Sequence, residues 1–165
     1  MQNKTKKYIY LFIGILTLIC NSCSGIKEKK FIYKHYKDNF SVFRDVNYMS
    51  YRGRNKDLSM IYVNIYSNCD NKGGISIYYD NISNSIISYE SSNNIDTTYL
   101  DYVVSSFISL NIFEIQTDTS RNIIKINLEE DSNHIIYRLS SDSIYNNIKL
   151  DNKLIKIKNN WYLTK

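Results

Sequence analysis

Residues 58–66 read LSMIYVNIY, and their alternation decides the fold class. Ile61, Val63 and Ile65 share one face of an extended segment, while tyrosines and polar residues share the other. Alternation of β-branched and aromatic residues is typical of a strand that buries one face. We therefore predict a strand over these nine residues.

Two further strands follow closely. The stretch SNCDNKGG at 67–74 is rich in turn-forming residues and leads into 75–79, and Asp80-Asn81 then precedes 85–90. Such short connections favour antiparallel pairing, so we predict a three-stranded meander.

Two stretches show the period of a helix instead. Residues 96–110 begin with the N-cap candidate Asp96 and end before Asn111, a possible left-handed stop. Residues 36–51 also fit one half of a helical wheel, with a stop near Gly53. The apolar residues of this second stretch are Tyr36, Phe40, Val42, Phe43, Val46 and Met49.

Short apolar or alternating segments fill the rest of the chain, at 112–115, 122–129, 134–139, 154–158 and 161–163. The pattern predicts an α+β fold: a mostly antiparallel β-sheet of about six or seven strands, with two amphipathic helices packed on one face. Proline is absent and glycine occurs five times, so Asn, Asp and Ser must make the turns.

The first 23 residues, MQNKTKKYIYLFIGILTLICNSC, have the layout of a secretory signal that ends at a lipid-attachment cysteine. Three lysines precede an apolar run of about a dozen residues. As a helix this run spans roughly 18 Å, whereas the bilayer core is about 30 Å thick. A cleaved signal therefore fits better than an uncleaved signal anchor.

Cys23 is the favoured lipidation site. Small residues surround it, Ser22 before and Ser24 after, whereas the bulky Ile19 directly precedes the alternative, Cys20. We expect residues 1–22 to be a lipoprotein signal peptide, 23–32 a solvated tether and 33–165 a single α+β domain. Acyl chains on the new amino terminus would then hold the domain on a membrane.

Removing the signal changes the charge balance. The whole chain has 21 basic and 16 acidic residues and a net charge of +5, and three of the basic residues lie within the signal. The mature chain is therefore nearly balanced, and we expect no nucleic-acid partner.

No catalytic constellation, metal site or cofactor motif stands out, and we expect none. Cys69 would be the lone thiol of the domain, with no histidine near it in sequence. His35 and His134 lack partners at metal-ligand spacing. Arg52-Gly53-Arg54 is the densest basic spot and could bind an anion, although such a cluster is ordinarily a solvated loop.

The surplus of tyrosine suggests a binding surface. Tyr62, Tyr66, Tyr78 and Tyr89 lie in the predicted meander, and aromatic sheet faces can bind sugars or peptides. They can equally be ordinary cover for the half-buried side of a sheet.

The basic, apolar signal, the cysteine at 23 and a small strand-rich domain resemble the many small, uncharacterised lipoproteins of bacterial cell envelopes. The closing segments IIYR at 135–138 and IKIKNNWY at 155–162 also look like those of such proteins. The resemblance implies a bacterial envelope location, facing the periplasm or the exterior, and no particular activity.

Three functions follow as hypotheses. The first is a non-enzymatic, lipid-anchored envelope domain that binds a protein, peptide or glycan. The second is a periplasmic inhibitor or immunity-type protein, and the third is a hydrolase with dispersed carboxylates.

The lipidation site is testable by mass spectrometry of the membrane fraction. Changing Cys23 to Ala should abolish acylation, because no other cysteine has small residues on both sides, and changing Cys20 to Ala should leave acylation intact. Persistent acylation of the Cys23→Ala chain would move the site to Cys20.

Overall fold

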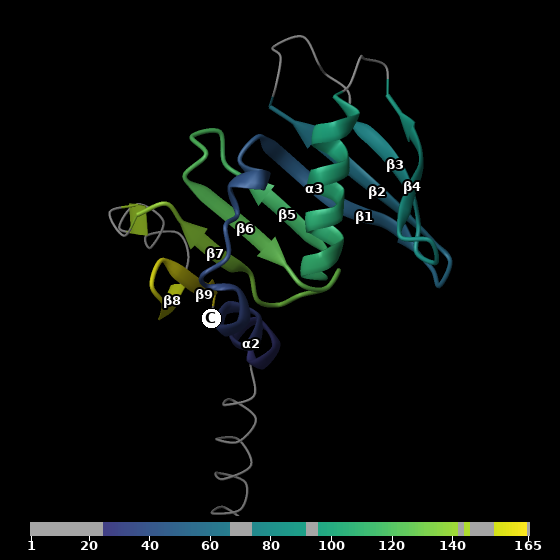
Figure 1. Cartoon of the computed structure of the whole chain (residues 1–165). Helices are drawn as coiled ribbons and strands as arrows, with labels where there is room; N and C mark the ends of the chain where they lie inside the picture. The colour runs from purple at the N-terminus through teal and green to yellow at the C-terminus, as the bar shows by residue number, and fades with distance from the viewer. Residues whose placement is uncertain (1–24, 67–73, 92–95, 142–143, 146–153, 165) are drawn as a thin grey trace, which may run out of the picture.

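Within the described residues, nine antiparallel strands form one sheet in the order β4-β3-β2-β1-β5-β6-β7-β9-β8 (Figure 1). The computed structural model describes residues 25–66, 74–91, 96–141, 144–145 and 154–164. The strands of this part are β1 (Val46–Arg54), β2 (Leu58–Ile65), β3 (Ile75–Asp80), β4 (Ser85–Glu90), β5 (Glu114–Thr117), β6 (Ile123–Asn127), β7 (Ile136–Leu139), β8 (Leu154–Lys158) and β9 (Trp161–Thr164). The α+β class is confirmed, although the sheet has more strands than the six or seven expected.

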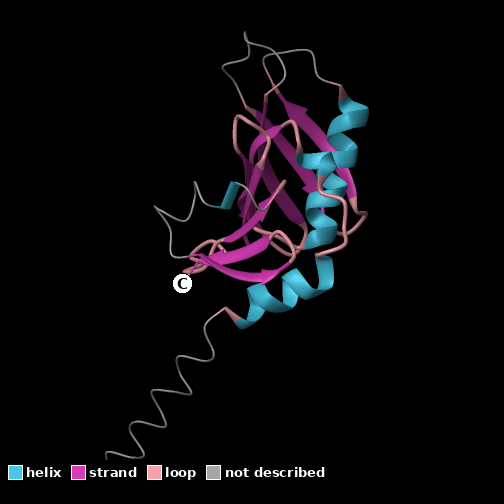
Figure 2. Ribbon diagram, turned by 90° about the vertical axis from the view of Figure 1, so that its left-hand side faces the viewer, coloured by secondary structure: helices cyan, strands magenta, loops and turns pink. Residues whose placement is uncertain are grey.

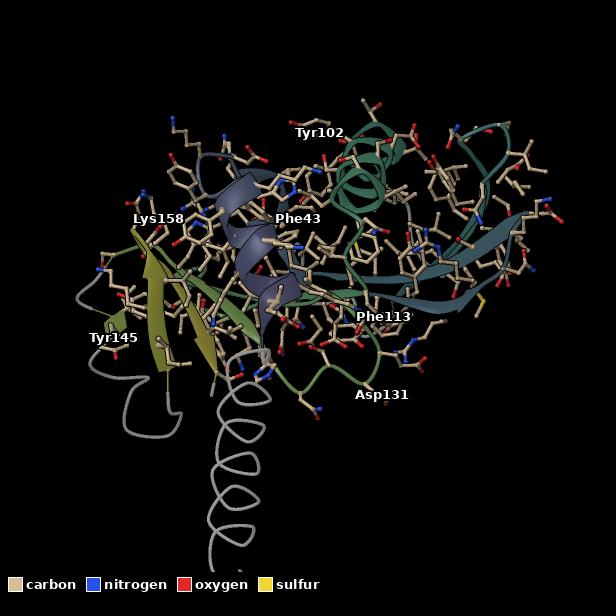
Figure 3. All side chains as sticks on the ribbon, turned by 90° about the horizontal axis from the view of Figure 1, so that it is seen from below. Phe43, Tyr102, Phe113, Asp131, Tyr145 and Lys158 are labelled. Carbon is tan, nitrogen blue, oxygen red and sulfur yellow. The ribbon has the colours of Figure 1, made fainter. Side chains whose placement is uncertain are left out.

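Two α-helices, α2 (Ile26–His35) and α3 (Thr97–Leu110), lie on the same face of the sheet, as the view in Figure 3 shows. Both contribute buried side chains to the cluster that contains the inner residues of the strands. The largest fully buried side chains include Trp161, Phe40, Phe43 and Phe107. We call the helix-covered side the inner face and the opposite side the outer face.

Helix α3 confirms the prediction for residues 96–110, including both ends. The Asp96 carboxylate accepts a hydrogen bond from the Tyr99 amide at 3.1 Å, which satisfies one of the free N–H groups at the helix start. Asn111 takes a left-handed conformation, with φ of 51°, and ends the helix. Leu100, Val103, Val104 and Phe107 form its buried stripe.

The prediction of a helix over residues 36–51 was wrong. Only a short 3-10 turn, η1 (Ser41–Phe43), forms there, and the chain then enters β1 at the centre of the sheet. A β-bulge at Asn47 explains the misleading period, because it places Val46 and Met49 on the same buried face although they are three residues apart. That spacing imitates one turn of a helix.

Residues 26–35 form helix α2, so the tether expected at 23–32 overlaps a helix that belongs to the domain. Ile32 is fully buried, and the Phe31 ring packs edge-on against Trp161 of β9 with ring centroids 6.3 Å apart. Figure 2 shows α2 crossing the lower end of the molecule, beside the last strands. Two of the last three residues of the expected tether are therefore core residues.

Asparagine makes several of the tight turns in this proline-free chain. Asn84, Asn111 and Asn159 all have positive φ, at 55°, 51° and 46°. At the β3–β4 turn, the Asp80 carboxylate accepts hydrogen bonds from the Ser83 hydroxyl and from the Ile82 and Ser83 amides, and these bonds hold its pKa below the ordinary value. The expected use of Asn, Asp and Ser in the turns is confirmed at these positions.

Within the described ranges, no helix is both long enough and apolar enough to span a membrane.

The packing of α2 predicts a specific pattern of stability. Changing Ile32 to Ala should lower the free energy of unfolding by about 2–5 kcal/mol, because it leaves a cavity in the core. Its exposed neighbour Tyr33 is the matched control, and Tyr33→Ala should change that free energy by less than about 0.5 kcal/mol. Chemical denaturation of the full chain measures both; equal, small effects would mean that α2 is a tether after all.

Candidate functional site

The outer face of β1, β2 and β3 carries a cluster of tyrosines around one arginine. Tyr48 and Tyr62 come from adjacent strands, and their ring centroids lie 6.3 Å apart. The Arg52 guanidinium lies 5.0 Å from the centroid of the Tyr62 ring and 5.7 Å from that of Tyr48. We call Tyr48, Arg52, Tyr62 and Tyr78 the tyrosine face.

A second β-bulge in β1 positions Arg52. Tyr51 pairs with Ile61 and Gly53 with Met60, so Arg52 is the extra residue between two paired positions. Bulges of this kind bend the strand and redirect a side chain. Here Arg52 lies over the two tyrosine rings, where a guanidinium gains cation–π attraction of about 0.5–1 kcal/mol per exposed contact.

Small residues make room for the rings. Ser50 is the direct cross-strand neighbour of both Tyr62 and Glu114, and it is buried. Gly74 lies so close to Tyr62 that a Cβ at this position would overlap its ring. Any larger residue at Gly74 would have to displace the Tyr62 ring.

Carboxylates border the tyrosine face and accept hydrogen bonds from two of its phenols. The Tyr48 hydroxyl donates to the Glu114 carboxylate at 2.9 Å, and the Tyr78 hydroxyl donates to that of Glu90 at 3.3 Å. Burial, and then the Glu114 carboxylate, raise the pKa of Tyr48, while Ser50 and, to a smaller extent, Arg52 oppose this rise. The charge of Glu90 raises the pKa of Tyr78. Both phenols are neutral donors at physiological pH, as is any tyrosine with an ordinary pKa of about 10.

The four tyrosines expected to form a binding face do not share one. Tyr62 and Tyr78 are diagonal neighbours on the outer face, and Tyr66 lies past the end of β2, where its hydroxyl donates to the Thr117 carbonyl at 2.6 Å. Tyr89 pairs with Ile77 and so belongs to the inner face. Its hydroxyl donates to Asp101 of α3.

Sequence reasoning missed Tyr48 and the role of Arg52. Tyr48 was assigned to the helix expected over 36–51, and Arg52 was placed just after that helix. The alternation of Tyr48, Ser50 and Arg52 with the buried Met49 and Tyr51 was the signal that could have found them.

Other candidate residues stay apart. His35 contacts Asp38, with the His35 Nδ1 and Asp38 Oδ2 atoms 2.6 Å apart, and His134 contacts the Thr164 carbonyl. In the described part of the chain, no group of three or more His, Cys, Asp or Glu residues could hold a metal ion. Cys20, Cys23 and Cys69 lie outside the described residues.

Comparison of the chain with known protein families, with characterised proteins and with solved structures gave no match.

The position of Tyr89 predicts a pH dependence. Burial, and then its hydrogen bond with the Asp101 carboxylate, raise the pKa of Tyr89 to about 12. Because the folded chain holds this proton more tightly than the unfolded chain does, the stability gained from it is present below about pH 10 and is lost as pH rises to about 12. Asp101→Asn should lower the pKa of Tyr89 and leave it above 10, because the burial remains.

NMR titration of the tyrosine ring carbons measures this shift. Asp131→Asn is the matched control, since Asp131 lies in the loop after β6, a strand five positions away from β4 in the sheet, and should leave that pKa unchanged. An unchanged pKa in the Asp101→Asn chain would contradict the contact between β4 and α3.

Proposed function

We propose that this protein is a non-enzymatic, lipid-anchored domain of the bacterial cell envelope that binds a partner protein through the tyrosine face. The observation that carries the proposal is the ordered stack of Arg52 over Tyr48 and Tyr62, on a sheet face that no described helix covers. Tyrosine and arginine dominate the energetic centres of protein interfaces.

The ring geometry favours a protein over a glycan. The planes of Tyr48 and Tyr62 are tilted by 56°, and Arg52 lies over both rings. The pair therefore offers no single flat platform on which a sugar ring could stack. A protein surface can instead contact the rings, the guanidinium and the bordering carboxylates together.

The sheet edges are poorly suited to a partner strand. Edge strand β4 has an unpaired bulge residue at Ile87, and edge strand β8 has one at Ile157. Bulges interrupt the row of backbone donors and acceptors that an added strand would need. These interruptions support binding at a face rather than at an edge.

The anchor fits this arrangement. Helix α2 begins at Ile26, three residues after Cys23, and three residues reach at most about 10 Å. Acyl chains on Cys23 would thus hold the α2 end of the domain close to the bilayer. Strands β1–β3 lie away from α2 (Figure 1), so a partner could approach the tyrosine face without meeting the membrane.

Site-specific photocrosslinking in the native envelope tests the proposal. A benzoylphenylalanine introduced at position 62 or 78 of the full chain should give the same discrete protein adduct. Position 102, an exposed tyrosine on α3, is the matched control and should give none. Arg52→Glu should reduce the adduct strongly, because loss of an interface hot spot costs about 2 kcal/mol or more, which weakens the complex roughly thirtyfold.

Two outcomes would contradict the proposal. One is the absence of a protein adduct at 62 and 78, or an equal adduct at 102. The other is an adduct that contains a saccharide, which would replace a protein partner with a glycan.

A further inference from the structure

A pocket lies where β1 extends beyond its neighbouring strand β5. Strand β5 pairs with β1 only at Tyr48, Met49 and Ser50, so residues 51–54 continue past that pairing. The chain that joins α3 to β5, together with the residues after β6, closes the space beside them and leaves a hollow of about 380 Å³. This volume is within the usual range of small-molecule sites, about 300–1,000 Å³.

The pocket lies at one end of the domain. The connection from α3 to β5 and the loop after β6 are both at the lower end in Figure 1, which faces the viewer in Figure 3, where Phe113 and Asp131 are labelled. The tyrosine face and the pocket share one residue, Arg52.

Aromatic and aliphatic groups line the interior of the pocket. Tyr51 is buried, and its ring centroid lies 6.3 Å from that of Phe113. Leu128, half-buried, adds an aliphatic side chain from beyond β6. An apolar skeleton placed against these groups would be removed from water, which stabilises binding by about 25 cal/mol for each Å² buried.

Two arginines form part of the exposed lining. The bulge at Arg52 sends this residue to the outer face, while Arg54, beside Ser59 in the register, belongs to the inner face. The Arg54 guanidinium lies 4.9 Å from the Tyr51 ring centroid, and its Nη1 donates to the Asn111 side-chain oxygen at 3.4 Å. A single strand thus places a guanidinium on each side of itself, and both line the pocket.

The charge of this lining is positive. None of the ion pairs formed within the described ranges includes Arg52 or Arg54. Glu130 is the one carboxylate among the described lining residues, and the C-terminal end of α3 adds a partial negative charge near Asn111. Two full positive charges therefore face one full and one partial negative charge.

We propose that this pocket binds an organic anion: a carboxylate carried on an apolar, preferably aromatic, skeleton. The skeleton lies against Tyr51, Phe113 and Leu128, and the carboxylate accepts hydrogen bonds from Arg54 and Arg52. Guanidinium groups suit this role because their planar N–H donors match a carboxylate. This site goes beyond the proposed function, because it needs no partner protein.

The carboxylate can belong to a free small acid or to the C-terminus of a peptide. Both present the same group to the arginines, so the experiment needs one probe for each source. Suitable probes are 3-(4-fluorophenyl)propanoate and a short peptide that ends in 4-fluorophenylalanine. Each is compared with its own neutral amide.

Fluorine NMR titration of the full chain in phospholipid nanodiscs measures the affinities. At least one acid should bind saturably, with a dissociation constant below about 1 mM, and at least tenfold more tightly than its amide. The acid that binds more tightly identifies the source. Arg54→Gln should weaken the binding of that acid severalfold while leaving the weak binding of the amide unchanged, which also shows that the variant is folded.

Two variants serve as controls. Arg44→Gln removes an exposed arginine outside the pocket, and Tyr78→Ala alters the tyrosine face alone; neither should change the affinity. The proposal of an anion pocket and the proposal of a protein partner can thus be contradicted separately. Three results would overturn the proposal: equal affinity for acid and amide, unchanged affinity in Arg54→Gln, or no saturable binding of either acid up to about 10 mM. A dissociation constant of 10 mM corresponds to a binding free energy of only roughly −2.7 kcal/mol.

Discussion

The structure depends on covering one whole face of a very wide sheet. Nine strands about 4.8 Å apart make a sheet roughly 38 Å across, whereas a helix is only about 10 Å wide. Helix α3 alone therefore cannot cover the inner face. Helix α2 covers the end formed by β8 and β9, where Phe31 and Phe40 pack edge-on against the buried Trp161. Residues 26–35 are thus part of the fold.

The outer face is used in two different ways. On the outer face of β7, β8 and β9, buried side chains form a second apolar cluster, in which the Tyr145 ring stacks on the Tyr162 ring with centroids 4.6 Å apart. Over β1–β3 the outer side of the sheet presents the tyrosine face, and there Arg52, rather than an apolar side chain, lies over the rings of Tyr48 and Tyr62. Of the two bulges in β1, one aligns Val46 with the core on the inner face, and the other places Arg52 on the outer face.

The sequence predicts local patterns well and long-range contacts poorly. The meander of β2–β4 and the two ends of α3 followed from alternation, Asp96 and Asn111, which are local signals. Strand β1 was mistaken for a helix because the bulge at Asn47 places Val46 and Met49 on one face, at a spacing that imitates a helical turn. Helix α2 was missed because its charged residues hide a short buried stripe. The pocket combines residues 51–54 with 111–113 and 128–130, and no single stretch contains that information.

Tyrosine footprinting with N-acetylimidazole tests the central claim, that the tyrosine face is an open surface until a partner covers it. In the purified protein Tyr62 and Tyr78 should be modified, whereas the buried Tyr51 and Tyr162 should not. In the proposed envelope location Tyr62 and Tyr78 should become protected while Tyr102, on α3, stays reactive. Equal reactivity of Tyr62, Tyr78 and Tyr102 in both settings would contradict the account.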